Sequence, residues 1–183
     1  MAIIYIRIKE ELVMNFYTTS GTADFLQKLI DKHPNEQLIL LSGTDKTVVL
    51  HETEGKSIFS LPKKYEVAAT HGPIEQLGYY VLHHFSADGG NRDVLLQQFK
   101  TALDTFKTDL SLRAFRLLKP KKGSEQIVFL THWSGPHSYE AWLASDSYKS
   151  QFEQLLKIEA SAVQKIFDGG NYVATYVAPP KED

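Results

Sequence analysis

The chain of 183 residues contains no cysteine. Disulfide bonds, thiolate metal sites, iron–sulfur clusters and cysteine nucleophiles are therefore excluded. Chains without cysteine are compatible with the reducing cytosol, and we expect a cytoplasmic location.

The sequence also lacks a long apolar run and a large excess of charge of one sign. No segment approaches the roughly 20 apolar residues of a membrane helix. Residues 1–10 have neither the basic region nor the small-residue cleavage site of a signal peptide. The formal net charge of -2 provides no global field that would attract nucleic acid or an anionic membrane. We therefore expect neither as a partner.

Several catalytic and binding motifs are missing as well. Gly89-Gly90 lacks the spacing of a dinucleotide or phosphate loop. There is no Gly-x-Ser-x-Gly elbow of a serine hydrolase. The seven histidines show no spacing typical of metal ligands, so a structural zinc site is not expected.

The residues that are present favour an ordinary globular protein, with 43% hydrophobic and 23% charged residues. In the first half, propensity and turn residues predict strands at 16–19, 37–42, 47–53 and 57–61. They also predict a helix at 22–32, which Pro34 prevents from continuing, and a short helix at 63–69. The second half predicts strands at 79–86, 112–118, 126–133 and 172–178, an amphipathic helix at 92–107 and further helix from 134 to 157.

This order, β-α-β-β-α followed by β-α-β-β-α-β, predicts an α+β fold with two ferredoxin-like units. We expect a partial unit at residues 14–76 and a complete one at residues 77–183. Two such units could pack sheet against sheet, as two subunits do in a dimeric α+β barrel. The chain could thus be a monomeric pseudo-dimer, and a homodimer through the second half remains an alternative.

Residues 1–13 have two interpretations. A second methionine, Met14, precedes the first predicted strand, so residues 1–13 could be an N-terminal extension. The alternative is an ordinary edge strand from Ile3 to Ile8.

Several segments resemble a known family. Residues 21–26, 32–34, 50–53 and 65–67 resemble the N-terminal half of the HmoB-type heme monooxygenases and of their relatives, the TRAP (target of RNAIII-activating protein) family. Residues 115–120, 130–133 and 145–149 resemble the C-terminal half, which belongs to the antibiotic-biosynthesis-monooxygenase (ABM) superfamily. The resemblance begins at Met14 and implies a dimeric or pseudo-dimeric α+β barrel.

In the heme-degrading branch, the resemblance implies a pocket formed by a strand asparagine, a strand tryptophan and an iron-binding helix histidine. The tryptophan corresponds to Trp133. His84 occupies the asparagine position, and Phe152 occupies the histidine position, four residues after Tyr148. Arg116 corresponds to an arginine that could pair with a heme propionate.

Each of these residues also has a simpler interpretation. A phenyl ring cannot bind iron, so Phe152 indicates either a filled apolar pocket or heme bound by another residue. His84 could be that iron ligand and a catalytic group, or a hydrogen-bonded strand residue. Trp133 could shape a catalytic cavity or belong to the core. Arg116 could instead form an ion pair with the partner sheet.

Two functions follow from the resemblance. The first is an ABM-type monooxygenase that degrades heme, or one that needs no cofactor and binds a small hydrophobic or aromatic ligand. The second is a non-catalytic, TRAP-like protein of signalling or stress response.

Overall fold

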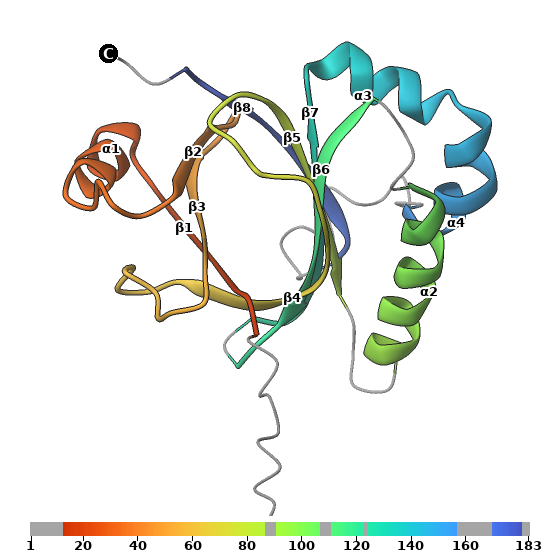
Figure 1. Ribbon diagram of the computed structural model, residues 1–183, viewed down its shortest axis with the longest axis horizontal. Helices are drawn as coiled ribbons and strands as arrows, with labels where there is room; N and C mark the ends of the chain where they lie inside the picture. The colour runs from red at the N-terminus through yellow and green to blue at the C-terminus, as the bar shows by residue number, and fades with distance from the viewer. Residues whose placement is uncertain (1–12, 87–90, 107–110, 123, 157–169, 181–183) are drawn as a thin grey trace, which may run out of the picture.

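Eight strands form one closed antiparallel barrel, with helices packed on its outside (Figure 1). The computed structural model describes residues 13–86, 91–106, 111–122, 124–156 and 170–180. The predicted α+β fold with two ferredoxin-like units in one chain is confirmed. Two sequence predictions concern residues outside the described ranges. They are the two interpretations of residues 1–13, of which only Val13 is described, and the predicted helix end at residue 157.

The first unit contains four strands and one helix. They are β1 (Asn15–Gly21), α1 (Ala23–Asp31), β2 (Leu38–Ser42), β3 (Thr47–Thr53) and β4 (Lys63–His71). Helix α1 begins where predicted, because the Thr22 hydroxyl accepts a hydrogen bond from the Phe25 amide at its N-terminus. Residues 54–62 are irregular and stand where a second helix would complete the unit.

The second unit contains four strands and more helical structure. They are β5 (Gly78–Ser86), α2 (Asn91–Phe106), β6 (Leu112–Pro120), β7 (Gln126–Trp133), α3 (Pro136–Leu143), the π-helical turn η1 (Tyr148–Phe152), α4 (Glu153–Leu156) and β8 (Tyr172–Ala178). In Figure 1, these helices cover one side of the barrel, and α1 lies on the opposite side.

Strand order shows how the two units form the barrel. The first unit has the order β4-β1-β3-β2, and the second has the equivalent order β8-β5-β7-β6. The second strand of each unit pairs with the fourth strand of the other, since β2 pairs with β8 and β4 pairs with β6. The chain is therefore a pseudo-dimer that closes its own barrel, although β2 and β8 join through one residue pair, Ser42 with Val177.

Two predicted elements in the first unit are wrong. Residues 63–69 form strand β4 and not a helix, because both edges of this segment are paired, with β1 and with β6. Tyr65 and Val67 pack into the barrel interior, whereas Ala68 and Ala69 contact the helix side after a bulge. Residues 57–61 do not form a strand, and residues 58–61 form bends. The first unit thus has four strands, with the fourth at 63–71.

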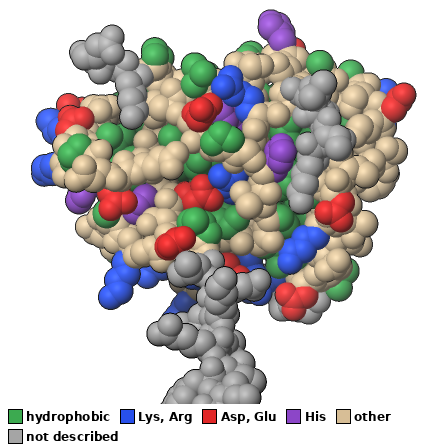
Figure 2. Space-filling view, viewed as in Figure 1, with side chains coloured by type: hydrophobic (Ala, Val, Ile, Leu, Met, Phe, Trp, Pro, Cys, Tyr) green, Lys and Arg blue, Asp and Glu red, His purple; other side chains and the backbone are tan. Residues whose placement is uncertain are grey.

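Three layers of buried side chains hold the fold together. One fills the barrel interior, a second lies between α1 and the first sheet, and the third lies between the second sheet and helices α2, α3 and α4. The third layer, which we call the aromatic layer, includes Phe85, Phe99, Phe106, Phe115, Phe129, Trp133, Trp142 and Phe152. Figure 2 shows acidic and basic side chains interspersed over one face of the molecule, in keeping with the small net charge.

The turn after β4 depends on a glycine. Gly72 has a φ of +65°, and a Cβ atom there would lie 2.2 Å from the carbonyl oxygen of Arg113. We expect Gly72→Ala to lower the free energy of unfolding by at least about 1–2 kcal/mol, because of the left-handed backbone and the clash. The midpoint of urea unfolding measures the effect. Gly55→Ala is the control, since its Cβ would meet only an ordinary contact at 3.5 Å; equal effects of the two substitutions would contradict the prediction.

Candidate functional site

The aromatic layer is where the resemblance places a pocket. Trp133 lies at the end of β7 and is fully buried. Its indole Nε1 donates a hydrogen bond of 2.8 Å to the Thr131 hydroxyl. Its ring centroid lies 5.2 Å from that of Trp142 and 5.7 Å from that of Tyr139, both on α3. Trp133 is therefore held in one orientation by strand and helix residues.

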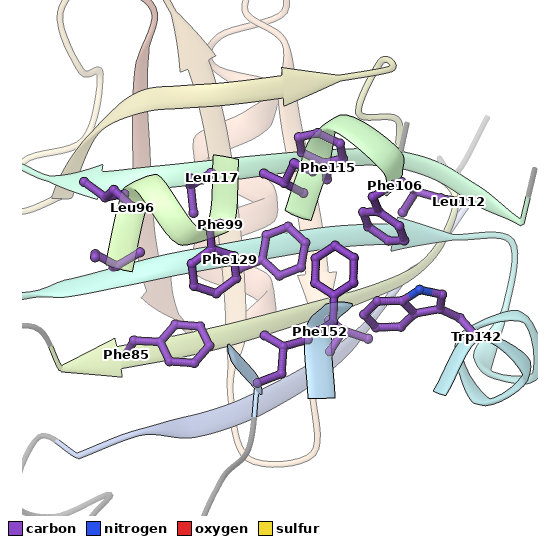
Figure 3. Packing of buried hydrophobic residues seen from close by; sticks show 14 of the residues in the cluster. Phe85, Leu96, Phe99, Phe106, Leu112, Phe115, Leu117, Phe129, Trp142 and Phe152 are labelled. Atoms are coloured by element: carbon purple, nitrogen blue, oxygen red, sulfur yellow. The ribbon is translucent and has the colours of Figure 1, made fainter. Parts of the chain in front are cut away.

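Phe152 points into the same layer from η1 and is fully buried (Figure 3). Its ring centroid lies 4.8 Å from Phe106, 5.4 Å from Trp142 and 6.1 Å from Phe129, with the last pair nearly parallel. These distances are those of favourable aromatic pairs in direct packing. Aromatic rings thus fill the space between the Trp133 strand and the Phe152 turn.

These residues do not fit a heme group. A porphyrin needs a planar slot and a ligand with a lone pair for iron, whereas Phe152 offers neither and its neighbours are in contact with its ring. Trp133 and Phe152 both belong to the packed aromatic layer.

His84 does not join them. Neighbouring strand residues face opposite sides of a sheet, and His84 faces the barrel interior, where its ring stacks on Tyr172 with centroids 4.2 Å apart. It lines a cavity of about 150 Å³, below the roughly 300–1,000 Å³ of pockets for drug-sized ligands. That space does not fit a porphyrin either, so an iron-ligand role for His84 has no support here.

Arg116 also faces the barrel interior, and all three nitrogens of its guanidinium group donate hydrogen bonds. Its Nε donates to Glu52 Oε1 at 2.7 Å and its Nη2 donates to Oε2 at 2.9 Å. Its Nη1 donates to the carbonyl oxygens of His71, Gly72 and Phe115. The alternative of an ion pair with the partner sheet describes this arrangement, since β3 belongs to the first unit and β6 to the second.

His83, and not the predicted site residue His84, is the imidazole that faces the aromatic layer. Its ring lies near Phe85, Phe129 and Tyr139, and its Nε2 is 3.4 Å from the Tyr139 hydroxyl. Burial lowers the pKa of His83 to about 4, so the ring is neutral at physiological pH. Tyr79 pairs directly with Trp133, so the odd-numbered residues of β5 share its face. The pairing register between β5 and β7 identifies His83 as the histidine beside Trp133, and local sequence does not reveal that register.

The described residues contain neither a cluster of metal ligands nor a membrane-spanning helix. There, no three histidine, aspartate or glutamate side chains gather to hold a metal ion. Among the described helices, none is both long and apolar enough to cross a membrane.

Comparisons with known proteins agree with this architecture. Residues 78–154 match the family model described as antibiotic biosynthesis monooxygenase. The signal transduction protein TRAP of Staphylococcus aureus is 27% identical over 176 residues, which cover 91% of this chain and 98% of that protein.

Two solved structures share the fold. The structure of a major regulator of staphylococcal pathogenesis has a TM-score of 0.77 at 21% identity, covering 91% of this chain and 99% of that one. A heme-degrading enzyme from Listeria monocytogenes has a TM-score of 0.68 at 17% identity, covering 90% of this chain and 99% of that one. Residues 78–154 of this chain are therefore similar to the antibiotic biosynthesis monooxygenase family.

Proposed function

We propose that this chain is a TRAP-like protein of signalling or stress response, which has the monooxygenase fold without degrading heme. The observation that carries the proposal is the packed aromatic layer around Phe152. The similarity to TRAP over nearly the whole of both chains supports it.

Separating the rings of the aromatic layer to admit heme would cost free energy. Phe106, Phe129 and Phe152 are each fully buried. Burying a side chain of this kind contributes about 1.5–3 kcal/mol relative to leaving it exposed. A porphyrin would have to separate several such rings and would gain no iron ligand from Phe152. The layer is therefore best suited to holding the helices on the second sheet.

A hemin titration tests this function. We expect no saturable Soret band and no saturable quenching of tryptophan fluorescence, because both tryptophans are packed in the aromatic layer. A saturable band that ascorbate and oxygen then remove in the presence of catalase would contradict the proposal. In that case His83→Leu and His84→Leu are matched variants: loss of the band in the first places the ligand in the aromatic layer, and loss in the second places it in the barrel interior.

A monooxygenase that needs no cofactor is the second candidate, and the His83–Tyr139 pair favours it. A neutral imidazole beside a buried phenol could accept a proton from an aromatic substrate that reacts with dioxygen. Burial raises the pKa of Tyr139, and the neighbouring Tyr148 and Tyr79 raise it further. The Tyr139 hydroxyl therefore keeps its proton. Oxygen uptake with an added hydroquinone, lost in His83→Leu and retained in His84→Leu, would favour this function over the first.

A further inference from the structure

The barrel interior contains a cavity that the aromatic layer does not share. It has a volume of about 150 Å³, and its walls come from both units. The first unit contributes Ser20 of β1 and Val48 of β3, and the second contributes His84 of β5 and Tyr176 of β8. A ligand there would touch both units.

The walls divide into an apolar part and a cationic part. Val48, Leu82, Leu118 and Val128 are buried and present apolar side chains. Lys46 and Lys63 line the same cavity from more exposed positions. None of the residues that line the cavity is an aspartate or a glutamate. The arrangement suits a molecule with a buried apolar segment and a negative charge near solvent.

His84 adds a specific polar group to this cavity. Its side chain is 6% exposed, and neither ring nitrogen has a hydrogen-bond partner among the described residues. A neutral imidazole carries one donor and one acceptor, and leaving both unsatisfied in a buried position is unfavourable. Stacking on Tyr172 fixes the ring plane but satisfies neither nitrogen. A ligand hydroxyl or carbonyl group would provide the missing hydrogen bond.

We propose that this cavity binds a short hydroxy- or oxo-carboxylic acid, with its carboxylate beside Lys46 and Lys63 and its hydroxyl or carbonyl group hydrogen-bonded to His84. The volume equals that of about five waters in the liquid, enough for a chain of three or four carbons and its inner oxygen. The carboxylate lies at the more exposed, cationic part of the wall.

The charges of the surrounding groups support this assignment. Burial lowers the pKa of Lys46, and the neighbouring Lys63 lowers it further. Burial lowers the pKa of His84 to about 3, with Lys63, Lys46 and His83 adding to the effect, so the ring is neutral and the two lysines carry the positive charge. A bound carboxylate relieves the repulsion between the lysines. The site lies on the other face of the sheet from the aromatic layer and does not depend on the proposed function.

Binding to the full chain can be measured with 4-hydroxybutanoate as the probe, by calorimetry and by the NMR signals of the histidine rings. We expect saturable binding and a shift of the His84 signals. Butanoate lacks the hydroxyl group and should bind about five- to tenfold more weakly, as expected for one lost hydrogen bond. Butane-1,4-diol lacks the carboxylate and should show no saturable binding. Phosphate binding as tight as 4-hydroxybutanoate would overturn the assignment to an organic acid.

Matched variants separate the two halves of the site. Lys46→Met/Lys63→Met should abolish binding, and Lys64→Met is the control, because Lys64 is the next residue of β4 and faces the other side of the strand. His84→Leu should bind 4-hydroxybutanoate and butanoate equally while remaining folded, since it removes a buried group without partners. Absence of saturable binding to the wild-type chain, or an equal loss in Lys64→Met, would overturn the proposal.

Discussion

Replacing Glu52 by alanine is expected to lower the free energy of unfolding by about 3–5 kcal/mol. The Glu52 and Arg116 side chains are 14% and 6% exposed, and two hydrogen bonds join them. Removing the carboxylate leaves a guanidinium inside the barrel with only carbonyl oxygens around it. A buried charge without its counter-charge is among the most destabilising changes that one substitution can make.

Two controls identify the cause of the loss. Glu75→Ala removes the carboxylate of the Arg113–Glu75 pair, whose side chains are 37% and 48% exposed, and should lower the free energy of unfolding by no more than about 1 kcal/mol. The double variant Glu52→Leu/Arg116→Leu should be more stable than Glu52→Ala alone, because it removes both charges together. Urea unfolding of the full chain measures all three. A cost for Glu52→Ala as small as that for Glu75→Ala would show that the buried pair does not stabilise the barrel.

This pair also explains why the role of Arg116 was difficult to infer from the sequence. A strand arginine within a family-like segment can face a ligand or an opposite strand, and local sequence does not decide between them. The deciding partner, Glu52, is 64 residues away. It becomes a neighbour only when the two units close the barrel. Long-range pairing of this kind leaves no periodic signal.

Strand β4 illustrates a similar limit. The segment 63–69 combines residues that suit either a helix or a strand, and a short apolar run does not distinguish the two. Pairing on both edges decides in favour of the strand. By contrast, α1 and α2 follow from local signals, namely the Thr22 cap and an amphipathic stripe that includes Phe99 and Phe106, and both helices were predicted to within one residue at each end.

The two histidines of β5 show what the sequence could and could not provide for the site. Neighbouring residues of a strand face opposite sides of a sheet, and His83 and His84 follow this rule. Which of the two shares a face with Trp133 depends on the register between β5 and β7. A shift of one residue in that register would exchange their environments. His84 was predicted to lie beside Trp133, but the register places His83 on that face and His84 in the barrel interior.

Phe152→Ala is expected to lower the free energy of unfolding by about 3–5 kcal/mol, the usual cost of removing a phenyl ring from a packed core. Phe152 is fully buried against Phe106, Phe129 and Trp142, so its loss leaves a cavity lined by aromatic rings. Phe25→Ala is the matched control, because Phe25 is 61% exposed on α1 and its replacement should change stability by less than about 0.5 kcal/mol. Equal effects would mean that Phe152 does not pack as the structure indicates.

The same variant separates a packed layer from a ligand pocket. A cavity with only apolar walls stays dry and takes up small apolar molecules such as benzene. Benzene should therefore raise the stability of Phe152→Ala while leaving the wild-type chain unchanged, since binding to the folded state alone stabilises it. If benzene instead stabilised the wild-type chain equally, the aromatic layer would already contain an open pocket. Phe152 would then line a binding site, and the cofactor-free monooxygenase would become the better supported function.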